Sequence, residues 1–488
     1  MENITSIPKA SSEPMPELEA FLRPLASVFR RSTSTQSMER YVTGLLTDLE
    51  HKTCETIAST VAGTSTERLQ HLLTDAAWEA TALDEQRVRE MVKISPAGGI
   101  LILDDTGLPK KGKRSPGVAL QYSGTLGKVG NCQVMVSAQY AVDEPQQSRP
   151  QHWPVSARLY LPESWAPDRP RRRRAHIPDE VAFQTKGEIA LDLVDRARAW
   201  GVPFSVVSTD AGYGNNPGFL EALEERHLAY IGGIERCFGV RLPEELRRAE
   251  EASPPAYRGR GRPPEPRAAP LHTAQEVVDA LPDSAWQTIS WREGRQGALS
   301  KQFVAARVHR ATGRRSKSAY CRPSRVKTGP QGWLLAERPL PGQEGKRKWY
   351  YSNLPAETSL QRLAALAHSR WIIEQFYEEA KGECGLDHFQ GRRWDGLHRH
   401  WALVMLTYSF LSQQRILLPI PPADDPCGDG RIGKIPQSPQ GVFPPCAGTT
   451  EPAGNPSSDH ALALAGSHPL LHRYRVHQTL PPSSKLTM

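Results

Sequence analysis

A segment near residue 375 carries charged and polar side chains at helical spacing. In RWIIEQFYEEAKGECGL, the residues Arg370, Glu374, Tyr377 and Lys381 follow one another at steps of four, three and four. At about 100° per residue these steps return to one face of a helix. A carboxylate between two cations on one helix face suits a site that holds a metal ion against a phosphate group. The alternative is an ordinary solvated face, since Glu378 and Glu379 lie near enough for pairs within the helix.

Two further carboxylates follow short apolar runs. In ILILDDTG, the run from Ile100 to Leu103 leads to Asp104 and Asp105, and in FSVVSTDAGYG a similar run leads to Asp210. Short aliphatic and β-branched runs are typical of buried strands. We expect each strand to end in a carboxylate next to a glycine-containing turn. Of the two adjacent aspartates, Asp104 is expected to be a neighbouring turn residue.

Two strand-end aspartates and one helical glutamate predict a metal-dependent reaction on phosphodiesters. Mg²⁺ prefers oxygen ligands and keeps several waters, so a few carboxylates and the substrate phosphate suffice to bind it. A pair of ions can activate the attacking oxygen and stabilise the departing one without a protein nucleophile. RNase H-like nucleases collect oxygen ligands in this way. A chain with 53 acidic residues contains such triples by chance, so their placement on two strands and a helix carries the prediction.

The chain resembles the DDE transposases of bacterial insertion sequences, in the cut-and-paste group with a Tyr, Arg, Glu, Lys motif on the catalytic helix. The group's pattern is Y-x2-R-x3-E-x6-K, and Arg370, Glu374 and Lys381 fit it. The tyrosine position holds Ala367 instead, which removes any contact that the tyrosine would make. The family's first aspartate precedes a threonine, which selects Asp105, and its second falls on Asp210.

The resemblance implies a function and a set of site residues. Asp105, Asp210 and Glu374 would be the catalytic residues and would bind Mg²⁺ or Mn²⁺, with two ions expected. Arg370 and Lys381 would contact the phosphate backbone. The protein would bind double-stranded DNA at the ends of its element, free a 3′-hydroxyl and join it to target DNA, as a homodimer that pairs two ends.

The composition is consistent with a DNA-binding protein. The 488 residues include 61 Lys and Arg against 53 Asp and Glu, a net charge of +8, which favours contact with nucleic acid. The seven cysteines include no C-x2-C pair, so neither a zinc knuckle nor a disulfide framework is indicated. The longest apolar stretch, around residues 401–411, is too short to span a bilayer. We expect a bacterial cytoplasmic protein that associates with the nucleoid when bound to DNA, without a membrane partner.

The order of elements predicts an α/β protein with an RNase H-like catalytic core, an N-terminal helical domain and a β-rich insertion domain. Three strands, a helix, a strand, a helix and a strand follow one another from residue 98. The helical domain carries either end recognition or a packing or dimerisation role. The expected organisation is a mobile leader at 1–16, a helical domain at 17–97, the first part of the core at 98–234, a linker and β-rich insertion at 235–350, the second part of the core at 351–417, and a disordered tail at 418–488.

Three basic clusters are candidate DNA contacts. They share a position in loops or in the insertion, where Lys and Arg hold the DNA backbone without reading its sequence. The insertion's linker contains Arg-Gly-Arg-Pro at residues 260–263, which resembles the core of a minor-groove AT-hook. A solvated loop or a chance match would give the same pattern. The candidates are Lys110, Lys111 and Lys113 after the first strand, Arg260 and Arg262 in the linker, and Arg314 and Arg315 in the insertion.

Two other functions fit the same residues. A nuclease on this fold would cut DNA without joining the 3′ end to a target. A domesticated, noncatalytic regulator would keep the basic surfaces and bind DNA without cutting it. The intact set of carboxylates favours an enzyme over the regulator.

Overall fold

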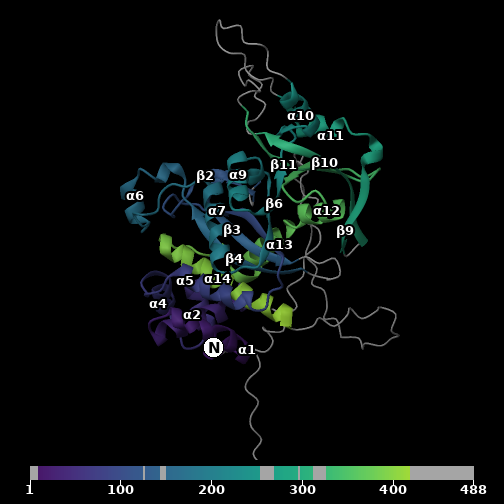
Figure 1. The fold of residues 1–488 in the computed structure, drawn as a ribbon. Helices are drawn as coiled ribbons and strands as arrows, with labels where there is room; N and C mark the ends of the chain where they lie inside the picture. The colour runs from purple at the N-terminus through teal and green to yellow at the C-terminus, as the bar shows by residue number, and fades with distance from the viewer. Residues whose placement is uncertain are drawn as a thin grey trace, which may run out of the picture.

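The computed structural model describes residues 9–124, 127–142, 150–252, 269–294, 297–311 and 326–417. Several expected features lie outside these residues: the first half of the leader, the linker with Arg260 and Arg262, the pair Arg314 and Arg315, and the tail from residue 418. The described part is a mixed α/β structure in which helices cover a large twisted sheet (Figure 1).

Five strands form the centre of the sheet, in the order β4-β3-β1-β5-β6. The first three are antiparallel neighbours, whereas β5 and β6 run parallel to β1. A helix separates each parallel pair, as such crossovers require. This order matches the predicted sequence of elements and is consistent with an RNase H-like fold. The bounds are β1 Gly99–Pro109, β3 Lys128–Val142, β4 Gln151–Tyr160, β5 Phe204–Thr209 and β6 Ala229–Ile234.

The β-rich region continues this sheet. Strand β12 (Lys348–Ser352) pairs with β6, and β11 (Thr328–Arg338), β10 (Gly297–Ala311) and β9 (Gln287–Gly294) follow beside it. The β-rich insertion expected within 235–350 therefore does contain strands, but within the described ranges they extend the central sheet and form no separate sheet of their own. Short strands β7 (Gly239–Arg241) and β8 (His272–Thr273) complete this end, with helices α10 (Pro243–Glu251) and α11 (Ala274–Asp279).

A buried ionic group lies inside this extension. The Glu337 carboxylate accepts hydrogen bonds from Lys301 Nζ and from His368 Nε2, each at 2.6 Å, and from the Tyr350 hydroxyl at 3.2 Å. Burial alone would raise the pKa of Glu337, but the bonds and charges of His368 and Lys301 outweigh it and hold this pKa at about 2. A buried carboxylate with several donors is tolerated because its charge is compensated.

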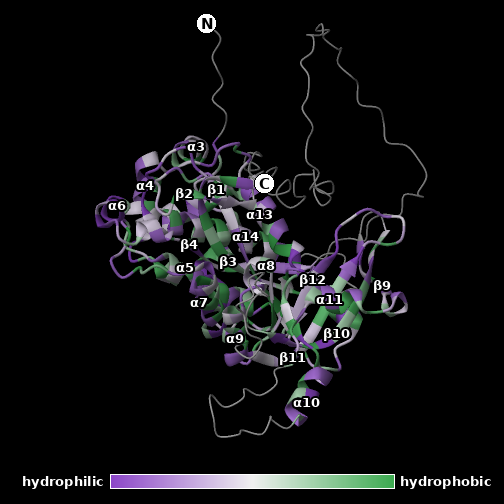
Figure 2. Ribbon diagram, turned by 90° about the horizontal axis from the view of Figure 1, so that it is seen from above, coloured by the Kyte–Doolittle hydropathy of each residue, from purple (hydrophilic) through white to green (hydrophobic). Residues whose placement is uncertain are grey.

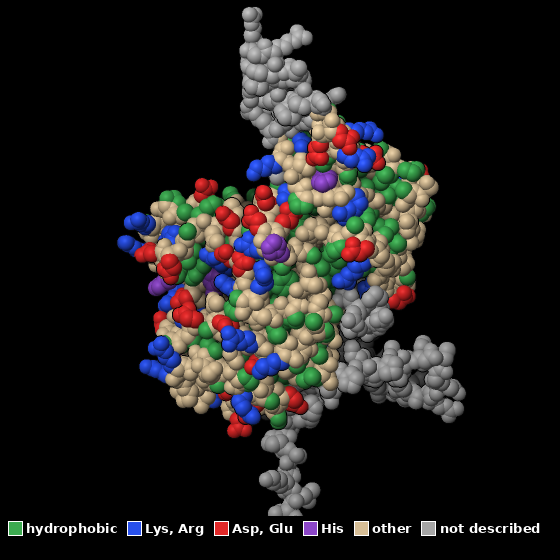
Figure 3. All heavy atoms as spheres, in the orientation of Figure 1, with side chains coloured by type: hydrophobic (Ala, Val, Ile, Leu, Met, Phe, Trp, Pro, Cys, Tyr) green, Lys and Arg blue, Asp and Glu red, His purple; other side chains and the backbone are tan. Residues whose placement is uncertain are grey.

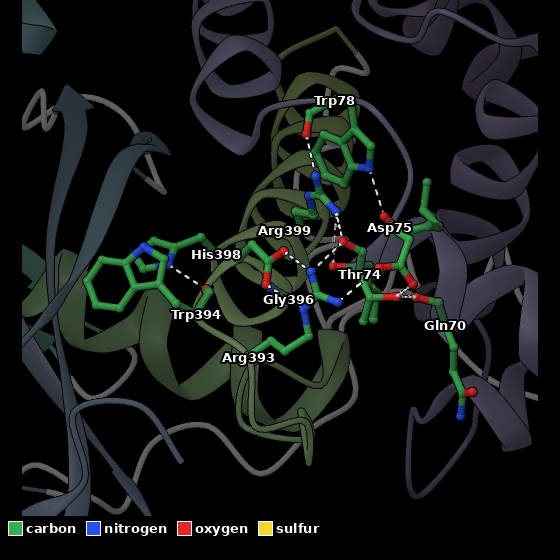
Figure 4. A network of polar contacts seen from close by, with 12 residues as sticks. Gln70, Thr74, Asp75, Trp78, Arg393, Trp394, Gly396, His398 and Arg399 are labelled. Carbon is green, nitrogen blue, oxygen red and sulfur yellow. Dashed lines mark hydrogen bonds and ion pairs between the residues drawn. The ribbon is translucent and has the colours of Figure 1, made fainter. Parts of the chain in front are cut away.

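The N-terminal helices pack against the last described helix, α14 (Trp394–Leu417). Arg393 donates to the Asp75 carboxylate at 2.9 Å and to the Thr74 carbonyl, and Arg399 donates to the carbonyls of Thr74 and Trp78 at 2.8 Å (Figure 4). These charge-assisted bonds fix the end of α4 to the start of α14. The helices are α1 Pro16–Leu22, α2 Ser32–Leu45, α3 Cys54–Thr60, α4 Thr66–Thr74 and α5 Ala80–Val92.

The remaining helices cover the two faces of the central strands. Helix α7 (Lys186–Ala199) packs on β3 and β4 from one side, while α13 (Trp371–Cys384) and α14 cover the other. Figure 2 shows that hydrophobic residues concentrate in the strands and in the helices packed on them. In the described part of the chain, no helix has the length and apolar character needed to cross a membrane. The other helices are α6 Arg169–Arg174, α8 Ala211–Gly214, α9 Pro217–Glu225 and α12 Leu360–His368.

Candidate active site

The register of β1 and β5 brings two aspartates side by side. The two strands pair in parallel as far as Leu103 and Thr209, so Asp104 and Asp210 are the next residues on each strand. Asp210 ends β5 as expected, and its carboxylate caps α8 by accepting from the Gly212 N–H at 2.9 Å. The expectation that β1 ends at its aspartates, next to a turn, is wrong, because this strand continues to Pro109 through its pairing with β3.

Successive side chains of β1 point to opposite faces of the sheet, so Asp104 and Asp105 lie on different faces. Asp104 is paired in register with Ser137 of β3, whose hydroxyl lies 2.6 Å from the Tyr377 hydroxyl of α13. Thr106, two residues further on, accepts a hydrogen bond from Lys381 Nζ at 2.9 Å. Since residues i and i+2 of a strand share a face, Asp104 faces α13.

The Arg370 guanidinium lies at the centre of the site. It donates to Asp104 Oδ2 at 2.7 Å and to Glu374 Oε1. Burial would lower the pKa of Arg370, but the charges of Asp104, Glu374 and Asp210 raise it overall. The helix face predicted from spacing therefore lies against β1, and the residues Arg370, Tyr377 and Lys381 each contact this strand or its neighbour.

The site carries more negative charge than its surroundings stabilise. Burial raises the pKa of Asp104 to about 7, and the charges of Asp210 and Asp105 act in the same direction against Arg370. Burial likewise raises the pKa of Asp210. The Glu374 side chain is 47% exposed, so the site opens to solvent beside the first turn of α13. Such a cluster favours a bound cation.

Asp105 lies in a different environment. Its carboxylate accepts from Lys186 Nζ at 2.9 Å and from the Tyr213 hydroxyl at 3.4 Å, on the face that α7 covers. The structure does not group Asp105 with Glu374. The choice of Asp105 as the first catalytic aspartate therefore stays a prediction, and the geometry favours Asp104.

The ligand types fit Mg²⁺ or Mn²⁺, although the side chains do not form a closed metal site. Within the described ranges, no three acidic, histidine or cysteine side chains converge closely enough to hold a metal ion. Asp104, Asp210 and Glu374 offer the oxygen ligands that these ions prefer. The Arg370 guanidinium supplies the positive charge between Asp104 and Glu374. The residues thus fit a divalent ion if Arg370 gives up these contacts.

The basic loop after β1 is partly occupied by structural contacts. Lys110 Nζ donates to the Phe389 carbonyl at 2.9 Å, and burial lowers the pKa of this amine. Lys111 and Lys113 are exposed, as a DNA contact requires. Sequence reasoning missed the basic helix α6 beside this loop, although the run RPRRRR at residues 169–174 was the signal.

Comparison with known proteins identifies a matching family and a relative. A family model described as "DDE superfamily endonuclease" matches residues 24–298, which include β1 and β5 but end before α13. A relative described as "Probable transposase for insertion sequence element IS701", from Microchaete diplosiphon, is 30% identical over 210 residues. That alignment covers 43% of this chain and 51% of the relative, so the chain spans about half the length of the curated relative that it matches.

The match to the family model extends over more than half of the chain and contains both strands that carry the aspartates. The third carboxylate, Glu374, comes from a helix beyond the match and reaches the same site through Arg370. The protein belongs to the DDE superfamily endonuclease family.

Proposed function

We propose that this protein is a transposase that binds the ends of its element, cuts DNA there and joins the freed 3′ end to target DNA. The family and the transposase named as a relative support this function. The observation that carries the proposal is the Arg370 guanidinium, which bridges Asp104 and Glu374 beside Asp210. Only a fold that brings together β1, β5 and α13 produces this group.

The proposal assigns the metal-binding role to Asp104, Asp210 and Glu374. Their carboxylates would hold Mg²⁺ or Mn²⁺, with two ions expected from the family resemblance. When bound, the ions would activate the attacking oxygen and stabilise the leaving oxygen of an in-line displacement. The capping bonds from the N–H groups of α8 orient the Asp210 carboxylate, and the strand pairing on both sides of β1 fixes the position of Asp104.

Arg370 and Lys381 have the charge and position to hold the DNA backbone. Arg370 is 32% exposed and lies between the carboxylates and solvent. In the proposed reaction it would exchange its carboxylate contacts for a phosphate of the DNA, since guanidinium binds both groups with two donors. Lys381 bonds Thr106 on the same face of β1, which places its ammonium two residues along the strand from Asp104.

The test is incubation of the purified full chain with labelled DNA from the genomic flanks of its gene and Mg²⁺. Joined products support the transposase. Cleavage without joining identifies a nuclease, and binding without cleavage identifies a noncatalytic regulator. Light scattering with and without this DNA tests whether two copies assemble on two ends, as a homodimer would.

Matched substitutions test the residue roles. Asp104→Asn, Asp210→Asn and Glu374→Gln should each abolish cleavage and leave DNA binding largely intact. Asp105→Asn is the neighbouring control, because its carboxylate bonds Lys186 and Tyr213 on the other face. If Asp105→Asn abolishes cleavage while Asp104→Asn retains it, the assignment of the first carboxylate reverts to Asp105.

A further inference from the structure

An exposed apolar surface lies on the hairpin formed by β2 (Ala119–Ser123) and the start of β3. The side chains of Leu120, Tyr122 and Val129 are 78%, 63% and 64% exposed. Tyr122 and Val129 are cross-strand partners, and Leu120 lies two residues before Tyr122 on the same face. Half of the large apolar side chains that are exposed in the described part of the chain belong to this one surface.

Exposed basic residues lie in the segments next to this apolar surface and on α6, which contacts the base of the hairpin. From Thr106 to Val142 the chain contains no Asp or Glu. The exposed basic side chains come from the loop before β2, from the start of β3 and from helix α6. Figure 3 shows Lys and Arg side chains over α6 at the left edge of the molecule. This basic rim consists of Lys111, Lys113, Arg114, Lys128, Arg173 and Arg174.

Specific contacts hold α6 against the base of the hairpin. Arg171 donates to the carbonyls of Val118 and Lys113 at 3.1 and 3.2 Å, and its guanidinium stacks on the Trp165 ring at 3.6 Å. The Trp165 indole N–H also donates to the Val118 carbonyl at 3.0 Å. These contacts fix α6, with Arg173 and Arg174, relative to the hairpin, and Figure 1 shows α6 next to β2.

The hairpin packs on the strand that carries Asp104 and Asp105. A Cβ on Gly107 would lie 2.1 Å from Ser123 Oγ, so the hairpin packs directly on β1, on the face that carries Asp105 and at a point three residues beyond Asp104. At about 3.3 Å per strand residue this separation is roughly 10 Å along β1.

We propose that this hairpin is a DNA-distorting contact, in which Leu120, Tyr122 and Val129 pack against unstacked bases while the basic rim holds the flanking phosphates. The inference rests on DNA being the substrate, as in the proposed function. Apolar side chains that wedge between base steps, and aromatic rings that stack on bases, are known ways to bind distorted DNA. A second copy of the chain fits less well, since a twofold contact would bring the like-charged rims together.

The test compares the binding of the full chain, in EDTA, to two labelled duplexes of one arbitrary sequence. One duplex is fully paired, and the other has a central mismatch next to a 2-aminopurine. The wild type should bind the mismatched duplex about five- to tenfold more tightly, and the 2-aminopurine fluorescence should rise on binding. The combined substitutions Leu120→Ser, Tyr122→Ser and Val129→Ser should remove this preference and this rise, with affinity for the paired duplex unchanged.

Two control variants accompany the test. Leu299→Ser removes an exposed leucine on β10, far along the sheet from β2, and should keep the preference. Arg173→Gln with Arg174→Gln should weaken binding to both duplexes equally and reduce its salt dependence.

A wild type without the preference, or a triple variant that keeps it, would overturn the proposal. A triple variant that changes only the oligomeric state in light scattering would also overturn it, in favour of a contact between copies. A wild type that prefers the mismatch but does not cleave with Mg²⁺ would support the hairpin and count against the proposed function alone.

Discussion

The Arg370→Gln substitution should destabilise the metal-free protein in a way that depends on pH. Arg370 compensates Asp104, whose side chain is only 12% exposed, and Glu374, which is 47% exposed. Removing one partner of a buried ion pair costs about 3–5 kcal/mol, and an exposed pair contributes about 0–1 kcal/mol. Because Arg370 itself is one-third exposed, we expect the lower end, about 3 kcal/mol at pH 8.

The sign of the pH effect follows from the pKa of Asp104. Burial raises this pKa to about 7 in the folded protein, so the carboxyl group favours folding at low pH and loses this contribution as the pH rises through 7. At pH 6 Asp104 is mostly neutral and does not need the guanidinium. At pH 8 it is ionised in the wild type, where the Arg370 charge lowers its pKa; in the variant the carboxyl group must either carry an uncompensated charge or hold a proton against the higher pH. The loss of stability should therefore be about 1 kcal/mol at pH 6 and larger at pH 8.

Urea unfolding in EDTA at both pH values measures these differences. The control is Arg226→Gln, which removes a two-bond ion pair with Asp195 on the surface of α7 and should cost no more than about 1 kcal/mol at either pH. Adding Mn²⁺ should restore more stability to the Arg370 variant than to the wild type, since no guanidinium competes for the carboxylates. An equal loss at pH 6 and pH 8, or none at all, would refute the role of Arg370 as the compensating cation.

Three other substitutions test the supports of the site and the sheet. Tyr377→Phe should lower the melting temperature by an amount that corresponds to about 1–2 kcal/mol, because it leaves the buried Ser137 hydroxyl without its 2.6 Å partner. Gly214→Ala should destabilise the protein by about 1–3 kcal/mol and reduce cleavage, since the new Cβ would lie 2.0 Å from a backbone oxygen of β6. The control is Gly112→Ala, whose new Cβ would lie in open space and should leave the melting temperature unchanged in the same thermal scan. Between pH 4.5 and 2 the wild type should lose about 3 kcal/mol of stability as Glu337, with its pKa of about 2, takes up a proton. The Glu337→Gln substitution should remove this part of the acid dependence. Equal slopes of stability against pH in acid titrations of the two proteins would count against this role of Glu337.

The sequence predicted which side chains of α13 share one face of the helix, because this depends only on the spacing of residues that are close in sequence. Spacing alone identifies which side chains share a face, and Arg370, Tyr377 and Lys381, which were predicted to share one, all contact β1 or β3. The same locality explains why the central strands and helices were identified in order. The short helix α8 was not predicted because its glycines indicated a turn, and the Asp210 cap provides the missing signal.

The sequence analysis chose Asp105 by family resemblance, whereas the geometry favours Asp104, and residue patterns alone could not decide because adjacent strand residues face opposite sides of the sheet. A shift of one residue in register exchanges the two faces, and the register depends on pairing with β3 and β5, which lie far away in sequence. Apolar residues fill both faces of β1, so no alternation of burial marks the side of α13. For the same reason the pairing of β12 with β6, which joins the β-rich region to the central sheet, was not foreseen.

The most direct test of the account is the location of Mn²⁺ by anomalous diffraction in crystals of the full chain with bound DNA. The account predicts metal bound by Asp104, Asp210 and Glu374, with the Arg370 guanidinium moved from these carboxylates to a DNA phosphate. Metal bound by Asp105 without Asp104, or Arg370 still bridging Asp104 and Glu374 beside an ordered scissile phosphate, would contradict it.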